Sequence, residues 1–261
     1  TEGIYGGLGM VITMKDKRLH VVKTIKNSPA QRAGIKPDDI FEKINGIAIK
    51  KSQVSELADK LRGKPGTKVT ITLSRPSEKK EYSYTLNREI ISIETVEYQT
   101  LKNNVGSIKI TSFSKKTNDQ LKKVLIIAKQ DKVKGFILDL RNNPGGLLDQ
   151  SVKIASHFLY HNRLVVYTQG REPADRHKYR AKYQNSLHST PVVILINQHS
   201  ASAAEIVAGA LRDSGKALII GENSYGKGTV QTIFRTSDGS GLRLTTSKYF
   251  TPSGTDITSQ G

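Results

Sequence analysis

Two kinds of hydrophobic pattern divide the chain. In the first third, short segments such as Lys68–Leu73 alternate between apolar and polar positions, which is typical of strands with one buried face. A helix is predicted among them, because apolar residues recur at i, i+3, i+4 and i+7 from Val54 to Leu61. After Arg88, strand-like apolar runs alternate with helical segments, which favours an α/β arrangement. We therefore expect two domains, residues 1–88 and residues 89–261.

The strand-like runs of the second domain are residues 105–110, 135–140, 191–196, 217–220, 229–234 and 242–250. Helical segments are expected from residue 117, over 148–159 and over 205–211. Residues 161–190 are polar and charged without clear periodicity. We expect a loop with a short helix there, at the wall of a substrate channel.

Composition narrows the function classes. The net charge is +18, which would attract nucleic acid or anionic lipid, but the lysines are dispersed and no basic-aromatic run resembles a nucleic-acid module. We expect a solvated basic surface and no nucleic-acid partner. The absence of cysteine excludes disulfides and thiolate catalysis, and the six histidines show no metal-ligand spacing, so no metal is expected. No segment has the ~20 consecutive apolar residues that span a bilayer.

The segment Asn197–Gln231 carries the candidate chemistry. A turn of small residues leads from a strand into a helix, and a hydroxyl on this turn would lie beside free N–H groups at the helix start. Ser202 is well placed there as a nucleophile, although composition alone does not separate it from Ser200. A serine hydroxyl needs a base, and a lysine can be that base only where burial keeps its amine neutral. Lys227 lies between two glycines, where other backbone can approach it closely.

Two other readings of this segment are rejected. Gly221–Lys227 nearly matches a phosphate-binding loop, but Gly228 and a strand-like run follow it instead of a helix start. Asp213 would return to the helix face of Ser202, but eleven residues at about 1.5 Å each place it roughly 16 Å along the axis. We expect Asp213 to be structural.

Three motifs together resemble the C-terminal processing (tail-specific) peptidases. They are D-L-R-N-N-P-G-G at residues 139–146, S-A-S-A-x-E-I at residues 200–206 and G-K-G-x-x-Q at residues 226–231. The resemblance implies that Ser202 is the nucleophile, that Lys227 is the general base and that Gln231 orients the lysine. It also implies an oxyanion hole formed by the N–H groups of Gly146 and Ala203.

The first domain resembles a PDZ domain. It contains S-P-A-x-x-A-G-I at residues 28–35 and a D-I-F-x-x-I-N-G hairpin at residues 39–46, with Asp38 where the family usually has glycine. Residues 7–10 are similar to the carboxylate-binding loop of that fold. The resemblance implies a peptide groove between this loop and the helix, and it makes Arg62 a candidate gate between domains. The implied groove residues are Leu8, Gly9, Met10, Val54, Leu57 and Leu61.

The resemblance spans nearly the whole chain. It implies an α/β core of crotonase-like type with an inserted α+β PDZ domain, and a serine endopeptidase that captures protein or peptide substrates by their C-termini without a cofactor. We further expect a fragment of an exported protein of the bacterial periplasm or cell envelope, with its signal peptide outside this sequence. A homo-oligomer would form through segments absent from it. The alternative is a non-catalytic PDZ-containing scaffold that binds peptides.

Overall fold

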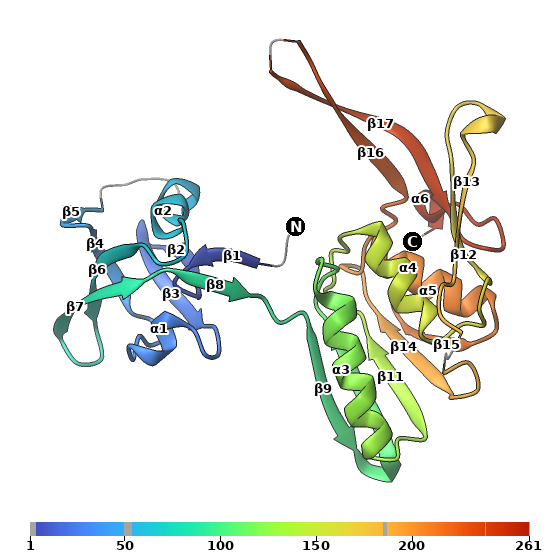
Figure 1. Cartoon of the computed structure of the whole chain (residues 1–261), viewed down its shortest axis with the longest axis horizontal. Coiled ribbons are helices and arrows are strands. Elements are labelled where there is room, and N and C mark those ends of the chain that lie inside the picture. Colours follow the sequence, from blue (N-terminus) through green and yellow to red (C-terminus); the bar gives the residue numbers. More distant parts are fainter. Residues whose placement is uncertain (1–3, 50–53, 185–186, 238, 261) are drawn as a thin grey trace. The chain divides into compact units, whose positions relative to one another are not determined.

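The chain forms two compact units in a computed structural model that describes residues 4–49, 54–184, 187–237 and 239–260 (Figure 1). The first unit runs to Ile93 and the second begins at Glu94. The sequence places the boundary near Arg88. Strand β8 (Glu89–Ser92) pairs antiparallel with β1 (Ile4–Gly7), so these later residues belong with the first unit.

The first unit is an antiparallel sheet with two helices. Its main sheet has the order β2-β3-β4-β6-β7, and β5 pairs with β4. On β6 every second residue is buried, as its alternating sequence predicts. The elements are β2 (Met10–Lys15), β3 (Arg18–Thr24), α1 (Pro29–Arg32), β4 (Ile40–Ile44), β5 (Ile47–Ala48), α2 (Val54–Leu61), β6 (Lys68–Arg75) and β7 (Lys80–Asn87).

The loop before β2 is fixed by the turn that begins α1. Ser28 caps α1 by accepting from Gln31 N, and its hydroxyl donates to Gly9 O at 3.1 Å. Gly9 has φ +77, and a side chain there would place Cβ 2.2 Å from Ser28 Cβ. Only glycine fits this position. Because β2 is the edge strand of its sheet, its outer side is not covered by another strand of that sheet.

Asp38 and Asp39 have different roles in the turn before β4. Asp38 has φ +66, a left-handed conformation that glycine adopts more readily than aspartate. Asp39 is buried, and its two carboxylate oxygens accept from Arg75 at 2.7 and 2.8 Å. This bidentate pair connects the start of β4 to the end of β6.

The second unit combines two sheets with helices. The larger sheet has the order β15-β14-β11-β10-β9; β9 and β10 are antiparallel, and the other neighbours are parallel. The smaller sheet has the order β13-β12-β17-β16. The elements are β9 (Val96–Leu101), β10 (Val105–Ile110), α3 (Thr117–Gln130), β11 (Gly135–Asp139), α4 (Leu148–Ser156), β12 (Leu164–Gln169), β13 (His177–Arg180), β14 (Val192–Ile196), α5 (Ala203–Asp213), β15 (Ala217–Gly221), β16 (Thr229–Arg235), β17 (Gly241–Phe250) and α6 (Ile257–Gln260), with short 3₁₀ turns at Lys102–Asn104 and Pro173–Asp175.

The prediction of a loop over residues 161–190 is wrong in part. This stretch contains β12 and β13, which pair with each other, and β12 also pairs with β17. The expected short helix is present only as the 3₁₀ turn at Pro173–Asp175. β12 is strongly buried because it packs against α5 and lies inside the smaller sheet.

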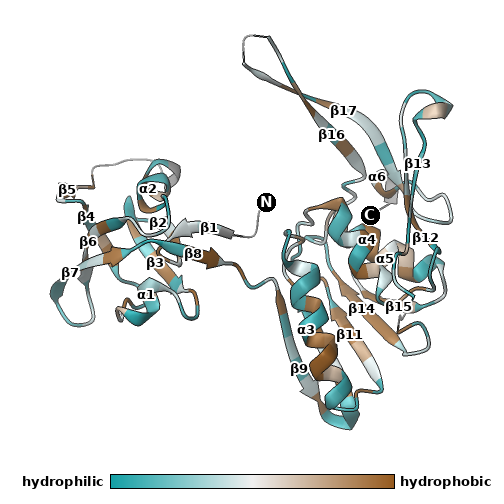
Figure 2. Ribbon diagram, viewed as in Figure 1, coloured by the Kyte–Doolittle hydropathy of each residue, from teal (hydrophilic) through white to brown (hydrophobic). Residues whose placement is uncertain are grey.

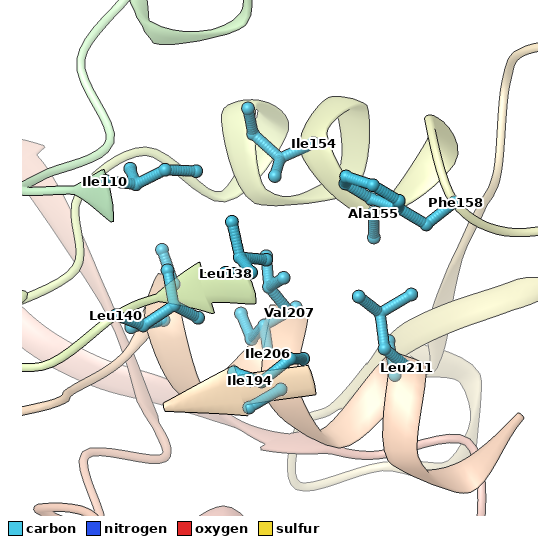
Figure 3. Close-up of a cluster of buried hydrophobic side chains, with 14 of the residues drawn as sticks. Ile110, Leu138, Leu140, Ile154, Ala155, Phe158, Ile194, Ile206, Val207 and Leu211 are labelled. Carbon is cyan, nitrogen blue, oxygen red and sulfur yellow. The ribbon is translucent and has the colours of Figure 1, made fainter. Parts of the chain in front are cut away.

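The core of the second unit lies between the larger sheet and helices α4 and α5. Figure 3 shows side chains of α4 and α5 meeting those of β11 and β14, among them Ile154, Leu138, Ile194 and Val207. These four side chains are fully buried. In Figure 2 the strands β11 and β14 are largely hydrophobic, as their continuous apolar sequences predict. The packing fixes the carboxyl ends of both strands, where the candidate motifs begin.

His157 makes the stability of the second unit depend on pH. It follows α4, and its Nε2 lies 2.9 Å from Asn118 Oδ1. Burial, helped by the nearby Lys122 charge, lowers the pKa of His157 from 6.5 to about 4. The unfolded chain therefore binds the proton first as the pH falls, and the folded state loses about 2–3 kcal/mol between pH 6.5 and 4.5 through this residue.

We expect His157→Gln to remove that contribution. Urea unfolding at pH 7 and pH 4.5 measures it: the drop in the free energy of unfolding between these pH values is smaller in the variant by about 2–3 kcal/mol. Equal drops in the two proteins would show that His157 is not the group responsible.

Candidate active site

Ser202 lies in a strained conformation at the start of α5. The chain leaves β14 at Ile196 and enters α5 at Ala203, and Ser202 between them has φ 54 and ψ −114. This region of backbone space is unfavourable for a non-glycine residue and costs roughly 1–3 kcal/mol. The Ser202 side chain is half-buried. The fold therefore holds one serine in a strained turn at a helix N-terminus.

Ser200 is distinguished from Ser202 by its environment. Ser200 is fully buried; its hydroxyl donates to Leu140 O at 2.8 Å and accepts from Asn197 N at 3.0 Å. These bonds connect the serine turn to the end of β11. The Ser200 hydroxyl is thus occupied by the main chain, which leaves Ser202 as the candidate nucleophile of the turn.

The glycine loop after β11 packs against the serine turn. Buried Asn143 donates to Ile110 O at 2.7 Å and accepts from Gly145 N at 2.8 Å, and its own carbonyl accepts from Ala201 N at 2.9 Å. A Cβ on Gly145, which has φ +92, would lie 2.8 Å from Ser202 Cβ and 2.9 Å from Ala203 N. The Gly145 main chain therefore lies directly against the candidate nucleophile.

Two backbone N–H groups of the loop and the turn remain free. Phe113 N donates to Gly145 O, and Leu147 N donates to Phe113 O, so this pairing passes over Gly146 N. Within the described part of the chain, neither Gly146 N nor Ala203 N donates a hydrogen bond. Ala203 N is the first helical N–H of α5, where the helix dipole favours negative charge. These groups can receive an anionic oxygen.

One carboxylate joins the lysine loop, residues 224–227, to the serine turn, residues 200–202. Ser202 N and Lys227 N both donate to Glu205 Oε2, at 2.6 and 2.9 Å. Tyr225 N also donates to Ser200 O at 2.9 Å. The nitrogens of Ser202 and Lys227 therefore lie within two hydrogen-bond lengths of each other, although 25 positions separate these residues in the sequence.

The Lys227 amine is not in the dry pocket that the sequence argument requires. Its side chain is exposed, and among the described residues no hydrogen bond joins it to the Ser202 hydroxyl. The loop follows the edge strand β15, and the neighbouring Tyr225 is 68% exposed, so little protein covers the amine. The structure brings together the main chains of Ser202 and Lys227 but not their reactive atoms.

Gln231 makes no contact with Lys227 among the described residues. It is an exposed residue of β16 that pairs with Thr245, beside an irregularity between Val230 and Gln231. None of the contacts found among the described residues joins Gln231 to Lys227. Between them, Gly228 is buried, and a Cβ there would lie 2.5 Å from Thr258 Oγ1.

Asp213 serves the segment after β17. It is the last residue of α5, and its carboxylate accepts from Ser253 N at 2.9 Å. Burial acts to raise the pKa of Asp213, but hydrogen bonds from Thr251 and Ser253 hold it below its usual value. Asp213 therefore connects α5 to residues 251–253, in agreement with the structural role expected from the sequence.

A second candidate site lies in the first unit, between the loop before β2 and helix α2. Leu8 O and Gly9 O accept hydrogen bonds from Ala30 N and Ile25 N, whereas Leu8 N and Gly9 N donate none within the described residues. Successive free N–H groups suit a carboxylate. The cavity beside them is lined by Tyr5, Gly7, Leu8, Gly9, Met10, Ile12, Ala58, Leu61 and Arg62.

The residues of α2 differ in their access to this groove. Leu57 and Leu61 are both buried in the hydrophobic core of the unit, but only Leu61 of the two also lines the cavity, so the predicted contact of Leu57 with peptide is not supported. The side chain of Val54 lies outside the described residues. The Arg62 guanidinium lies 5.5 Å from the centre of the Tyr5 ring and 3.6 Å from Asp59. Its role as a gate stays a prediction.

Sequence reasoning missed Glu205. Its position three residues after Ser202 matches the S-x-x-E pattern of a helix capping box, which could have identified it.

Two absences are also clear within the described residues: no group of histidine and acidic side chains could hold a metal ion, and no helix is long and apolar enough to cross a membrane.

Family profiles identify the class of protein to which the chain belongs. The sequence profile of peptidase family S41 matches residues 104–261, and a PDZ domain profile matches residues 20–75. The chain belongs to peptidase family S41 and contains a PDZ domain.

Known relatives agree with this assignment. The chain is 41% identical to the carboxy-terminal-processing protease of Bartonella bacilliformis. The match covers 98% of this chain and 60% of that protein. It is 39% identical to a probable CtpA-like serine protease of Staphylococcus aureus over its whole length, which is 52% of that protein. The chain thus spans between half and two thirds of these relatives.

Solved structures share the fold. The photosystem II D1 C-terminal processing protease is 29% identical, with a TM-score of 0.57 over 98% of this chain and 70% of that one. A putative S41 protease from Bacteroides fragilis has a TM-score of 0.58 over 97% of this chain and 75% of that one. The latter is 18% identical, and the likeness concerns the fold alone.

Proposed function

We propose that this chain is the PDZ domain and core of a serine endopeptidase that cleaves polypeptides captured by their C-termini. The observation that carries the proposal is the hydrogen bonding of Ser202 N and Lys227 N to one carboxylate oxygen, at 2.6 and 2.9 Å. It brings a strained serine and a lysine together in a member of a peptidase family. The relative from Bartonella, named a carboxy-terminal-processing protease, supports the same activity.

In this proposal Ser202 attacks the peptide carbonyl. Lys227 Nζ takes the hydroxyl proton as the bond from Oγ to the carbonyl carbon forms, and the N–H groups of Gly146 and Ala203 bind the resulting oxyanion. Each such donor contributes on the order of 3 kcal/mol. The lysine then gives its proton to the leaving amine, and water releases the acyl group from Ser202.

The lysine acts as a base only where water is excluded from its amine, and its side chain is exposed in this structure. We infer that the Lys227 side chain turns towards Ser202 when a bound polypeptide covers both residues and excludes water. Gln231 orients the amine in that state. Lys227 N stays bound to Glu205 in this movement, so the main chain of the lysine keeps its place beside Ser202.

The PDZ domain supplies the capture of the substrate. The free N–H groups of Leu8 and Gly9 bind the terminal carboxylate, the polypeptide adds as a strand to the edge of β2, and Met10 and Leu61 contact its last side chains. This mode of binding requires a chain end but no folded partner. The substrate class is therefore proteins or peptides with an accessible C-terminus.

A pair of substrates that differ only at the chain end tests this function. We expect the chain to cleave an unstructured polypeptide with a free C-terminal carboxylate at a KM about 10–100-fold below that of its C-terminal amide, because the amide loses charge-assisted hydrogen bonds. Steady-state kinetics on the two peptides measures the ratio. Equal KM values would contradict capture by the C-terminus, and an absence of any cleavage would contradict the peptidase assignment.

A non-catalytic peptide-binding scaffold is the second candidate function. It is favoured by one observation, the exposed Lys227 side chain without a bond to Ser202. The scaffold explains the PDZ groove equally well, but it leaves the strained Ser202 and the free N–H groups without a purpose.

The remaining family expectations are also proposals. We propose that the α/β core is of the crotonase-like type, which its parallel strands and intervening helices support. The expected place of action is the bacterial periplasm or cell envelope, and homo-oligomers are expected to form through further segments of a longer protein.

A further inference from the structure

We propose that Glu205 is a positioning residue for the reaction, whose carboxylate sets the distance between the nucleophile and the base. The proposal rests on the proposed function, since it assigns a role within the same site. Glu205 is the third residue of α5 and is 5% exposed.

The first support is the number and origin of its hydrogen bonds. Oε2 accepts from Ser202 N at 2.6 Å and from Lys227 N at 2.9 Å. Oε1 accepts from Ser224 Oγ and Gly226 N, both at 2.6 Å. An ionised carboxylate only accepts hydrogen bonds, and four short ones use its capacity fully.

A helix cap explains only one of these bonds. In a capping box, the glutamate at this position bonds to the N–H of the residue before the helix, which is Ser202 N here. The other three donors lie 19, 21 and 22 positions further along the chain. Glu205 therefore attaches the whole loop of Ser224 to Lys227 to the serine turn, which capping does not require.

The second support is the charge. No lysine, arginine or histidine forms an ion pair with Glu205 among the described residues, so its charge is held by neutral donors alone. A buried charge held in this way depends on all of its donors, because each lost bond leaves part of the charge uncompensated. The loop cannot shift without that cost, and this makes the separation of the Ser202 and Lys227 main chains rigid.

Glu205→Gln keeps the size of the side chain but replaces one acceptor oxygen by an NH₂ group. Two of the four hydrogen-bond donors then lie against the NH₂ group, which cannot accept their hydrogen bonds. The loop of Ser224 to Lys227 therefore separates from the serine turn. With wild type and variant compared per folded molecule, we expect kcat to fall about 10–100-fold while KM changes less than about threefold, because the groove that binds the C-terminus is in the other unit.

Two further variants complete the test. Glu222→Gln changes an exposed glutamate of the same loop and is expected to leave kcat and KM unchanged. Ser224→Ala removes a single donor and is expected to fold with a melting temperature lowered by only a few degrees and with kcat lowered about 3–10-fold, so it decides the question even where Glu205→Gln does not fold.

The outcomes separate this inference from the function on which it rests. Wild-type kcat in folded Glu205→Gln, or in Ser224→Ala where the first variant does not fold, would overturn the positioning role while leaving the peptidase intact. A fall in kcat accompanied by an equal rise in KM would also overturn it, because that pattern indicates that substrate binding is weakened as well as the chemical step. If the wild type itself does not cleave the substrate, the proposed function is refuted instead.

Discussion

Ser202→Ala and Lys227→Ala each lower the rate of cleavage by at least about 10³-fold, to the level of the uncatalysed control. The first variant removes the attacking oxygen, and the second removes the group that takes its proton. Both variants retain the main-chain hydrogen bonds of residues 202 and 227 to Glu205. We therefore expect both variants to fold. Initial rates on an unstructured polypeptide with a free C-terminus, at equal protein concentration, measure the loss.

The control for the lysine is Lys129→Ala, an exposed lysine on α3, which is expected to cleave at the wild-type rate. Because the nucleophile and the base act together in one catalytic step, the double variant should be no slower than either single variant. Equal activity of the wild type, Ser202→Ala and Lys227→Ala would eliminate the serine–lysine mechanism. An inactive wild type that still binds peptides would favour the scaffold.

Gly145→Ala is expected to lower kcat/KM by about 10²-fold or more. A Cβ at this position would lie 2.5 Å from Ala201 O and 2.8 Å from Ser202 Cβ, and φ +92 is unfavourable for alanine. The serine turn must move to make room, and Ser202 then leaves its alignment with the free N–H groups. Steady-state kinetics together with a peptide-binding assay checks the prediction, since binding at the PDZ groove should not change.

Gly135→Ala is the matched control for this loop. It lies on the strand that leads to Gly145, and its added Cβ would meet its nearest atom, Pro191 O, at an ordinary 3.5 Å. We expect it to keep most of the wild-type activity. If Gly145→Ala retained the same activity as Gly135→Ala, the glycine loop would have no part in positioning the nucleophile.

The sequence could predict the elements whose patterns are local and strong. The parallel strands are continuous apolar runs, and the serine, glycine and lysine motifs come after such runs, so the sequence could predict that each motif follows a strand. Leu164–Gln169 carries a similar β-branched run but lies among charged residues, and it was interpreted as a loop. Its burial depends on β17, more than 70 positions later, which no local pattern reveals.

The details of the site depend on tertiary contacts and could not be predicted in the same way. Leu57 and Leu61 lie on the same face of a helix by spacing and both belong to the core, yet only Leu61 of the two also lines the groove. The exposure of Lys227 depends on what covers the loop after an edge strand. The contacts of Glu205 with the loop before Lys227 could not be predicted, because three of its four hydrogen-bond donors are about 20 positions away in the sequence.

The most direct test of the account is to identify the atom that becomes acylated. The protein is mixed with an activated ester of a short peptide, quenched within one turnover and mapped by mass spectrometry. The account predicts a single acyl group on Ser202 in the wild type and none, on the same time scale, in Lys227→Ala. Acylation of a different residue, or acylation of Ser202 at an unchanged rate without Lys227, would contradict it.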